Sequence, residues 1–82
     1  MRYILFVKET CPYCVMAEEL LRDHGQELNT VVFGPEQLGT LEEMKKAYDW
    51  ATVPMVFKRE GNQIEFVGGY TDLKEYLESG GK

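Results

Sequence analysis

The 82-residue sequence contains only two cysteines and one histidine. The two cysteines fall within four residues of each other, so they cannot cross-link distant parts of the chain, and the disulfide framework of a small secreted protein is excluded. A structural zinc ion normally takes four ligands, which one histidine and two cysteines do not supply, so we expect no metal site. The close pair of cysteines therefore indicates redox chemistry.

Signals for a membrane or for secretion are also missing. No apolar run approaches the roughly 20 residues of a membrane-spanning helix, and the N-terminus lacks the basic region and cleavage site of a signal peptide. We therefore expect a cytoplasmic protein without a membrane partner. A formal net charge of −5 argues against nucleic acid as the main partner.

Length and composition predict one compact domain. Hydrophobic residues make up 44% and charged residues 28% of the chain, as in ordinary globular proteins. A chain this short needs a dense core, which five tyrosines, four phenylalanines and one tryptophan can supply. We expect residues 1–82 to form a single domain that is a monomer.

The first part of the chain has the pattern of a β-α-β unit. Residues Arg2–Val7 form an apolar run without alternation, which is typical of a strand covered on both faces. An amphipathic helix is predicted from Pro12 to a stop at Gly25. The β-branched run Thr30–Phe33 predicts the second strand, and the crossover between the two strands should be right-handed.

The second part predicts a helix, a hairpin and a last helix. Thr40 and Glu43 have the spacing of a capping box, which predicts the start of the second helix. Two strands, Met55–Lys58 and Gln63–Val67, flank a tight turn and should be antiparallel. Thr71 is the predicted N-cap of the last helix. The expected order of elements is β-α-β-α-β-β-α.

The two cysteines should differ in reactivity. Pro12 suits the first helical position, which makes Cys11 the N-cap, and backbone N–H groups of Tyr13 and Cys14 can then point at its sulfur. The positive end of the helix, with help from Lys8, should lower the pKa of the Cys11 thiol. Cys14 lies one turn further along, within disulfide reach and less exposed. We therefore predict Cys11 as the nucleophile and Cys14 as the resolving thiol. The alternative is that both are ordinary core cysteines, but a C-x-x-C between a strand and a helix is more typical of a redox site.

Three motifs resemble those of the glutaredoxin family: Cys11–Cys14 (CPYC), Thr52–Pro54 (TVP) and Gly68–Leu73 (GGYTDL). They occur in the family's order, and the resemblance is closest to the small dithiol glutaredoxins of bacterial type. The resemblance implies a thioredoxin-like α/β fold, with a four-stranded mixed sheet flanked by three helices. It also implies a glutathione-dependent thiol–disulfide oxidoreductase that serves electron transport and cell redox homeostasis.

The same resemblance implies a binding site for glutathione. Pro54 would be a cis-proline that exposes the backbone of Val53 to the cysteinyl unit of glutathione. Lys8, helped by Tyr13, would hold the glycine carboxylate, and the start of the last helix would hold the γ-glutamyl group. Trp50 is expected in the core or at the rim rather than in contact with the ligand. The predicted glutathione-binding residues are Lys8, Tyr13, Thr52, Val53, Pro54, Gly69, Tyr70, Thr71 and Asp72.

In the expected reaction Cys11 attacks a glutathionylated protein or a small disulfide, and a second glutathione resolves the mixed disulfide that forms. For protein disulfides Cys14 resolves the intermediate, and ribonucleotide reductase is a plausible acceptor by resemblance. Two other functions stay open. One is a redoxin driven by thioredoxin reductase, against which the GGYTD motif argues. The other is a module in which Cys11 and glutathione carry an iron–sulfur cluster between two protomers, which Pro12 disfavours.

Overall fold

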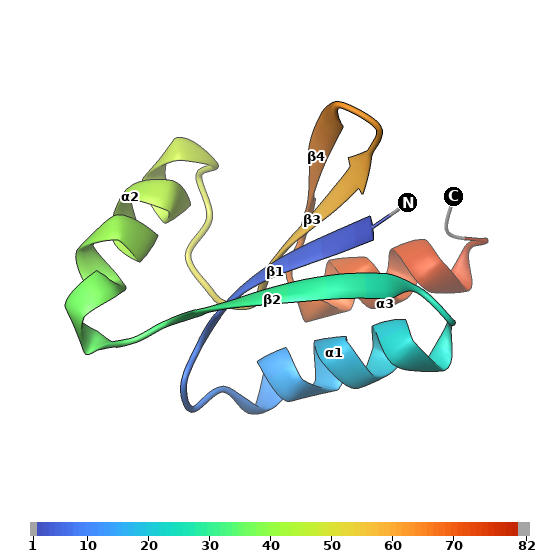
Figure 1. Cartoon of the computed structure of the whole chain (residues 1–82), viewed down its shortest axis with the longest axis horizontal. Coiled ribbons are helices and arrows are strands. Elements are labelled where there is room, and N and C mark those ends of the chain that lie inside the picture. The colour runs from blue at the N-terminus through green and yellow to red at the C-terminus, as the bar shows by residue number, and fades with distance from the viewer. Residues whose placement is uncertain (1, 81–82) are drawn as a thin grey trace.

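The computed structural model describes residues 2–80, which form a four-stranded sheet with helices on both faces (Figure 1). The strand order is β2-β1-β3-β4; β1 is parallel to β2, and the other two neighbouring pairs are antiparallel. The predicted element order and the mixed sheet are confirmed. Along the chain the elements are β1 (Arg2–Lys8), α1 (Pro12–Asp23), β2 (Glu27–Phe33), a short 3₁₀ turn η1 (Pro35–Gln37), α2 (Leu38–Ala47), β3 (Met55–Glu60), β4 (Gln63–Gly68) and α3 (Tyr70–Glu78).

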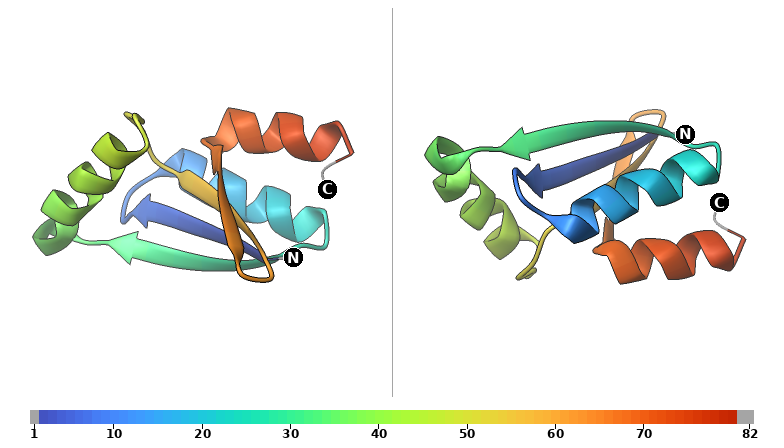
Figure 2. Two further views of the ribbon diagram at one scale, coloured as in Figure 1. Left: turned by 90° about the horizontal axis from the view of Figure 1, so that it is seen from above. Right: turned by 90° about the horizontal axis from the view of Figure 1, so that it is seen from below.

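Side-chain alternation along β1 divides the core into two layers. Tyr3, Leu5 and Val7 are buried in the layer that also contains residues of α1 and α3. Ile4 and Phe6 pack into the second layer, with residues of α2 and β3. Helices α1 and α3 lie side by side on the first layer (Figure 2, right). Both faces of β1 are therefore covered, as its continuous apolar run predicted.

The second helix begins before the residue that the sequence indicated. Helix α2 starts at Leu38, directly after η1, and its N-cap residue Gln37 makes no side-chain capping hydrogen bond. Thr40 is thus an interior residue of the helix, and the predicted capping box of Thr40 with Glu43 is wrong. The 3₁₀ turn already brings the chain into a helical path, so no capping side chain is needed at Thr40.

The last helix also begins earlier than predicted. Gly69 is the N-cap of α3 and Tyr70 is its first residue, so the predicted N-cap at Thr71 is wrong. The cap comes from within the first turn, where the carboxylate of Asp72 accepts a hydrogen bond from the backbone N–H of Gly69 at 3.1 Å. The short side chain of Asp72 thereby pairs the backbone N–H of Gly69, which an N-cap at Thr71 would have left without a partner.

The strands extend beyond the predicted apolar runs. Strand β2 begins at Glu27 rather than at Thr30, because its backbone pairs with β1 from Arg2 onward. The exposed Arg2 side chain also donates hydrogen bonds to Glu27 at 2.9 Å and to Asn29 at 3.1 Å. Strand β3 ends at Glu60 rather than at the predicted Lys58, and β4 ends at Gly68 rather than at Val67. Only the two residues 61 and 62 remain in the turn between them. At that turn Gly61 has a φ of 61°, which glycine adopts without strain.

Lys58 holds α3 against the hairpin. Its ammonium donates a hydrogen bond to the hydroxyl of Tyr76 at 3.0 Å, lies 4.9 Å from the centre of that ring, and is 3.5 Å from the carboxylate of Glu65. The hydrogen bond with Tyr76 raises the pKa of Lys58. Helix α3 packs against β3 and β4, whereas α1 packs against β1 and β2, so these contacts of Lys58 fix α3 to its own pair of strands.

Candidate active site

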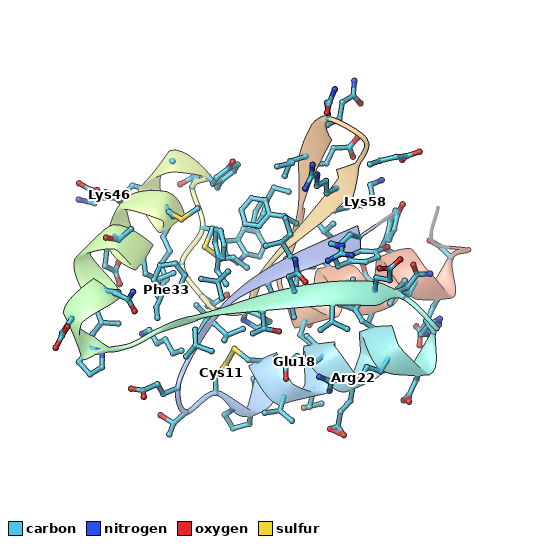
Figure 3. All side chains as sticks on the ribbon, viewed as in Figure 1. Cys11, Glu18, Arg22, Phe33, Lys46 and Lys58 are labelled. Carbon is cyan, nitrogen blue, oxygen red and sulfur yellow. A yellow bond between two sulfur atoms is a disulfide. The ribbon has the colours of Figure 1, made fainter. Side chains whose placement is uncertain are left out.

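The two cysteines occupy the first turn of α1. Cys11 is the N-cap in extended conformation and Pro12 is the first helical residue, as predicted. The backbone N–H of Cys14 donates to the sulfur of Cys11 at 3.2 Å. The two sulfurs are joined in a disulfide, seen as a yellow bond beside the Cys11 label (Figure 3), and the Cα atoms are 5.2 Å apart. The structure therefore shows the oxidised form of the pair.

The two sulfurs differ in exposure and in surroundings. Cys14 is only 3% exposed and belongs to the core layer under α1, whereas Cys11 is partly exposed. Cys11 is therefore the sulfur that a second molecule can reach. We expect the N–H of Cys14 and the positive end of α1 to stabilise a thiolate at Cys11 by about 0.3–2 kcal/mol once the disulfide is reduced.

A groove opens next to Cys11. It has a volume of about 320 Å³, which lies within the range of small-molecule sites. The carbonyl oxygen of Val53, in its wall, lies 3.9 Å from the sulfur of Cys11. The Val53–Pro54 peptide bond is cis, as the resemblance implied. The groove is lined by Tyr13, Trp50, Thr52, Val53, Pro54, Gly69, Tyr70, Thr71 and Asp72.

One end of the groove is the first turn of α3. The first bond of this helix runs from the N–H of Leu73 to the carbonyl of Gly69 at 3.0 Å, so the N–H groups of Tyr70, Thr71 and Asp72 precede it. Such N–H groups and the positive helix end favour a bound carboxylate. The Asp72 carboxylate lines the same wall and suits an ammonium group. This end of the groove thus suits a ligand group that carries both a carboxylate and an ammonium.

The structure brings eight of the nine predicted glutathione-binding residues to this groove, and the exception is Lys8. Lys8 lies in a separate hollow of about 160 Å³ that is lined by both cysteines and shares no residue with the groove. The hollow also contains Val15 and Val32, which are about half exposed. Lys8 is therefore beside the disulfide, but the structure does not place it among the other predicted residues.

Trp50 is the groove residue that sequence reasoning missed. It lies in the loop between α2 and β3 and packs edge-on against Phe66, with 5.1 Å between ring centres. The prediction of core or rim is met in part, because the ring contacts the aromatic layer and also lines the groove. Trp50 lies outside any periodic pattern, so the sequence does not indicate which way its side chain faces. Its position just before Thr52–Pro54 was the only sequence feature that pointed to the groove.

Residues 2–80 contain neither a cluster of metal ligands nor a membrane-spanning helix. No group of three or more histidine, cysteine, aspartate or glutamate side chains in this range is arranged to hold a metal ion. Within the same range, no helix has both the length and the apolar character that crossing a membrane requires.

The sequence is similar to those of the glutaredoxin family and to one hybrid peroxiredoxin. A family model described as glutaredoxin matches residues 4–62. The hybrid peroxiredoxin hyPrx5 of Haemophilus influenzae is 31% identical over 73 residues, which are 89% of this chain. The matched part is 28% of hyPrx5, so the chain spans less than a third of that relative's length.

Solved structures of three glutaredoxins resemble this chain. Glutaredoxin 1 from Francisella tularensis has a TM-score of 0.74 at 22% identity, over 95% of this chain and 93% of the other. The dithiolic glutaredoxin 2-C-Grx1 of Trypanosoma brucei brucei has a TM-score of 0.75 at 30% identity, over 96% of this chain and 79% of the other. The glutaredoxin of Brucella melitensis has a TM-score of 0.68 at 27% identity, over 98% of this chain and 82% of the other. The expected thioredoxin-like α/β fold is confirmed. The family match over more than half of the sequence, together with the Cys11–Cys14 pair at the start of α1, shows that this chain belongs to the glutaredoxin family.

Proposed function

We propose that the chain reduces glutathione mixed disulfides and protein disulfides with glutathione as the reductant, with Cys11 as nucleophile and Cys14 as resolving thiol. One observation carries the proposal: the accessible sulfur of Cys11 lies at the start of α1 and 3.9 Å from Val53 in the wall of the groove. A molecule bound in that groove would have its own sulfur next to Cys11.

In the first half-reaction the Cys11 thiolate attacks the glutathione sulfur of a glutathionylated protein. The substrate S–S bond breaks, the protein cysteine leaves as a thiolate that water protonates, and Cys11 is left in a mixed disulfide with glutathione. The thiolate of a second glutathione then attacks the bound glutathione's sulfur. This step releases oxidised glutathione and restores the Cys11 thiolate, so Cys14 is not required.

A protein disulfide would follow the dithiol route. Cys11 attacks one sulfur of the substrate and forms a mixed disulfide with it, and Cys14 then attacks Cys11. The substrate leaves with both thiols reduced, and the Cys11–Cys14 disulfide seen in the structure remains. Two glutathione molecules reduce it and become oxidised glutathione. The burial of Cys14 suits this role, because its thiol needs to reach only Cys11.

The groove would hold glutathione by its backbone and its two ends. The cysteinyl unit pairs with the backbone of Val53 as a short antiparallel ladder. The γ-glutamyl carboxylate binds N–H groups at the start of α3, and its ammonium binds Asp72. We assign the glycine carboxylate to Tyr13, which lines the groove, and to Lys8, which lies beside Cys11 in the neighbouring hollow. Thr52, Pro54, Gly69, Tyr70 and Thr71 complete the proposed site.

The proposal extends to the setting of the reaction. We propose that residues 1–82 act as a single, monomeric domain in the cytoplasm, where the glutathione pool keeps thiols reduced. Ribonucleotide reductase, from the family resemblance, and a peroxiredoxin, from the name of the Haemophilus influenzae relative, are the candidate protein partners.

Replacing the carboxylate at the start of α3 tests glutathione recognition. We expect Asp72→Ala to lower kcat/KM for glutathione about tenfold, because the ammonium loses a charged hydrogen-bond partner. The lost cap to Gly69 should cost only about 1 kcal/mol of unfolding free energy. Steady-state turnover at varied glutathione concentration, with denaturant unfolding of the same sample, gives both quantities.

Glu75→Ala provides the matched control. Glu75 is an exposed carboxylate on the same helix and does not line the groove. Its removal changes the net charge by the same amount as Asp72→Ala, so any long-range electrostatic effect should be similar. If both variants show the wild-type dependence on glutathione, the assignment of Asp72 to the γ-glutamyl group is wrong.

A further inference from the structure

The indole N–H of Trp50 is a buried donor without an acceptor. Its nitrogen, Nε1, is fully covered by protein and has no hydrogen-bond partner among the described residues. Buried polar groups are nearly always paired, because an unpaired one loses its hydrogen bonds to water without replacement. Trp50 lines the groove, so a ligand bound there can supply the missing acceptor once the indole tilts toward it.

The indole is held by packing alone. It contacts the ring of Phe66, and it lies close to Gly69, where a Cβ atom would be 3.5 Å from Cζ2 and 3.9 Å from Nε1 of Trp50. The backbone N–H of Trp50 is fixed to the carbonyl of Lys45 at 2.7 Å. The residue is thus anchored through its main chain, and a small tilt of the ring breaks no hydrogen bond.

The same contacts place the indole at one particular end of the groove. Gly69 is the N-cap of α3, so Trp50 is beside the turn whose N–H groups of Tyr70 and Thr71 precede the first helical bond. A carboxylate has about four acceptor positions on its two oxygens. Backbone N–H groups and an indole N–H can therefore share one carboxylate.

We propose that Trp50 is a specificity-determining residue of the groove, whose indole N–H donates a hydrogen bond to the α-carboxylate of the γ-glutamyl unit. The inference rests on the proposed function, since it presumes glutathione in this groove. A site with a buried donor discriminates strongly against a ligand that lacks the acceptor, because the donor then stays unpaired. Trp50 would thus favour glutathione over thiols that have no γ-glutamyl carboxylate.

Trp50→Phe tests the role of the N–H, because it removes the donor and keeps an aromatic ring. We expect KM for glutathione to rise about tenfold with kcat changed less than about twofold. Cysteinylglycine, which lacks the γ-glutamyl unit, should be used equally well by both proteins. Tyr48→Phe is the matched control: Tyr48 packs on the same Phe66 ring, with centres 5.2 Å apart, and does not line the groove. An equal loss for both thiols, or the same loss in the control, would overturn the proposal.

A second measurement leaves Trp50 itself unchanged. The chain has one tryptophan, so a ¹⁵N-labelled sample gives one indole N–H resonance. The Cys14→Ser protein is treated with oxidised glutathione; the Cys11 thiolate then displaces one glutathione thiolate and keeps the other as a mixed disulfide. We expect the indole proton to move downfield and to exchange more slowly with water, alongside shifts of the Thr71 and Asp72 amides.

The outcomes separate this inference from the proposed function. Shifts of the Thr71 and Asp72 amides with an unchanged indole resonance would overturn the role of Trp50 and leave glutathione binding supported. Unchanged resonances at all three positions in the mixed disulfide would overturn both. A shifted indole in the mixed disulfide with glutathione, but not in that with cysteinylglycine, would support the γ-glutamyl carboxylate as the acceptor.

Discussion

The Cys11→Ser variant is expected to lose turnover of glutathionylated substrates down to the uncatalysed background. The hydroxyl of serine does not ionise near neutral pH, so the helix end has no sulfur anion to stabilise and no mixed disulfide can form. Cys14→Ser should keep a large part of this activity, because a second glutathione resolves the intermediate. The same Cys14→Ser protein should fail to reduce protein disulfides through the dithiol route.

Coupled turnover assays on the two variants measure this contrast, with one glutathionylated protein and one disulfide protein as substrates. Thermal unfolding of the reduced proteins is the control, since Cys14 is buried and serine adds a hydroxyl to the core. Equal losses of deglutathionylation in both folded variants would contradict the assignment of roles. It would mean that partial exposure and the position at the helix N-terminus do not decide which thiol attacks.

Gly68→Ala should have the largest effect on stability among substitutions near the groove. Gly68 has a φ of 129°, and a Cβ there would lie 2.6 Å from Oδ2 and 2.7 Å from Cγ of Asp72. The added methyl group must displace the side chain that caps α3 at Gly69. We expect a loss of about 2–4 kcal/mol of unfolding free energy. KM for glutathione should rise as well, because Asp72 is moved.

Gly61→Ala separates backbone strain from this clash. Gly61 also has a positive φ, 61°, but no described heavy atom beyond its two chain neighbours lies within 4 Å of its Cβ position. Its substitution should cost only about 1 kcal/mol and leave KM for glutathione unchanged. Urea unfolding of both variants measures the difference. Similar losses of unfolding free energy at the two positions would show that the contact between residue 68 and Asp72 does not determine the effect of Gly68→Ala on stability.

The sequence predicts the arrangement of the fold because apolar periodicity is a local signal. The run Arg2–Val7 and the β-branched run Thr30–Phe33 mark the two parallel strands, and Pro12 sets both the start of α1 and the position of Cys11. The geometry of the cysteine pair follows from that one helix start. These features depend on neighbours in sequence, which explains why they can be derived without the structure.

Some of the missed features depend on contacts between distant residues, and others on local contacts that compete with the predicted ones. Strand β2 starts at Glu27 because its backbone pairs there with Arg2 of β1, a residue 25 positions earlier in the chain. The Thr40 and Thr71 caps failed because a 3₁₀ turn and the Asp72 carboxylate took over their roles. Trp50 enters the groove through its packing on Phe66, a contact that no local pattern encodes.

The choice of reductant tests the central claim most directly. The reduced wild-type protein is given a glutathionylated protein substrate and either glutathione with glutathione reductase or thioredoxin reductase alone, and NADPH oxidation is followed. We expect sustained turnover that saturates with glutathione, and only background turnover with thioredoxin reductase. Turnover with thioredoxin reductase and none with glutathione would contradict this claim, since the groove beside Cys11 would then have no role in binding glutathione.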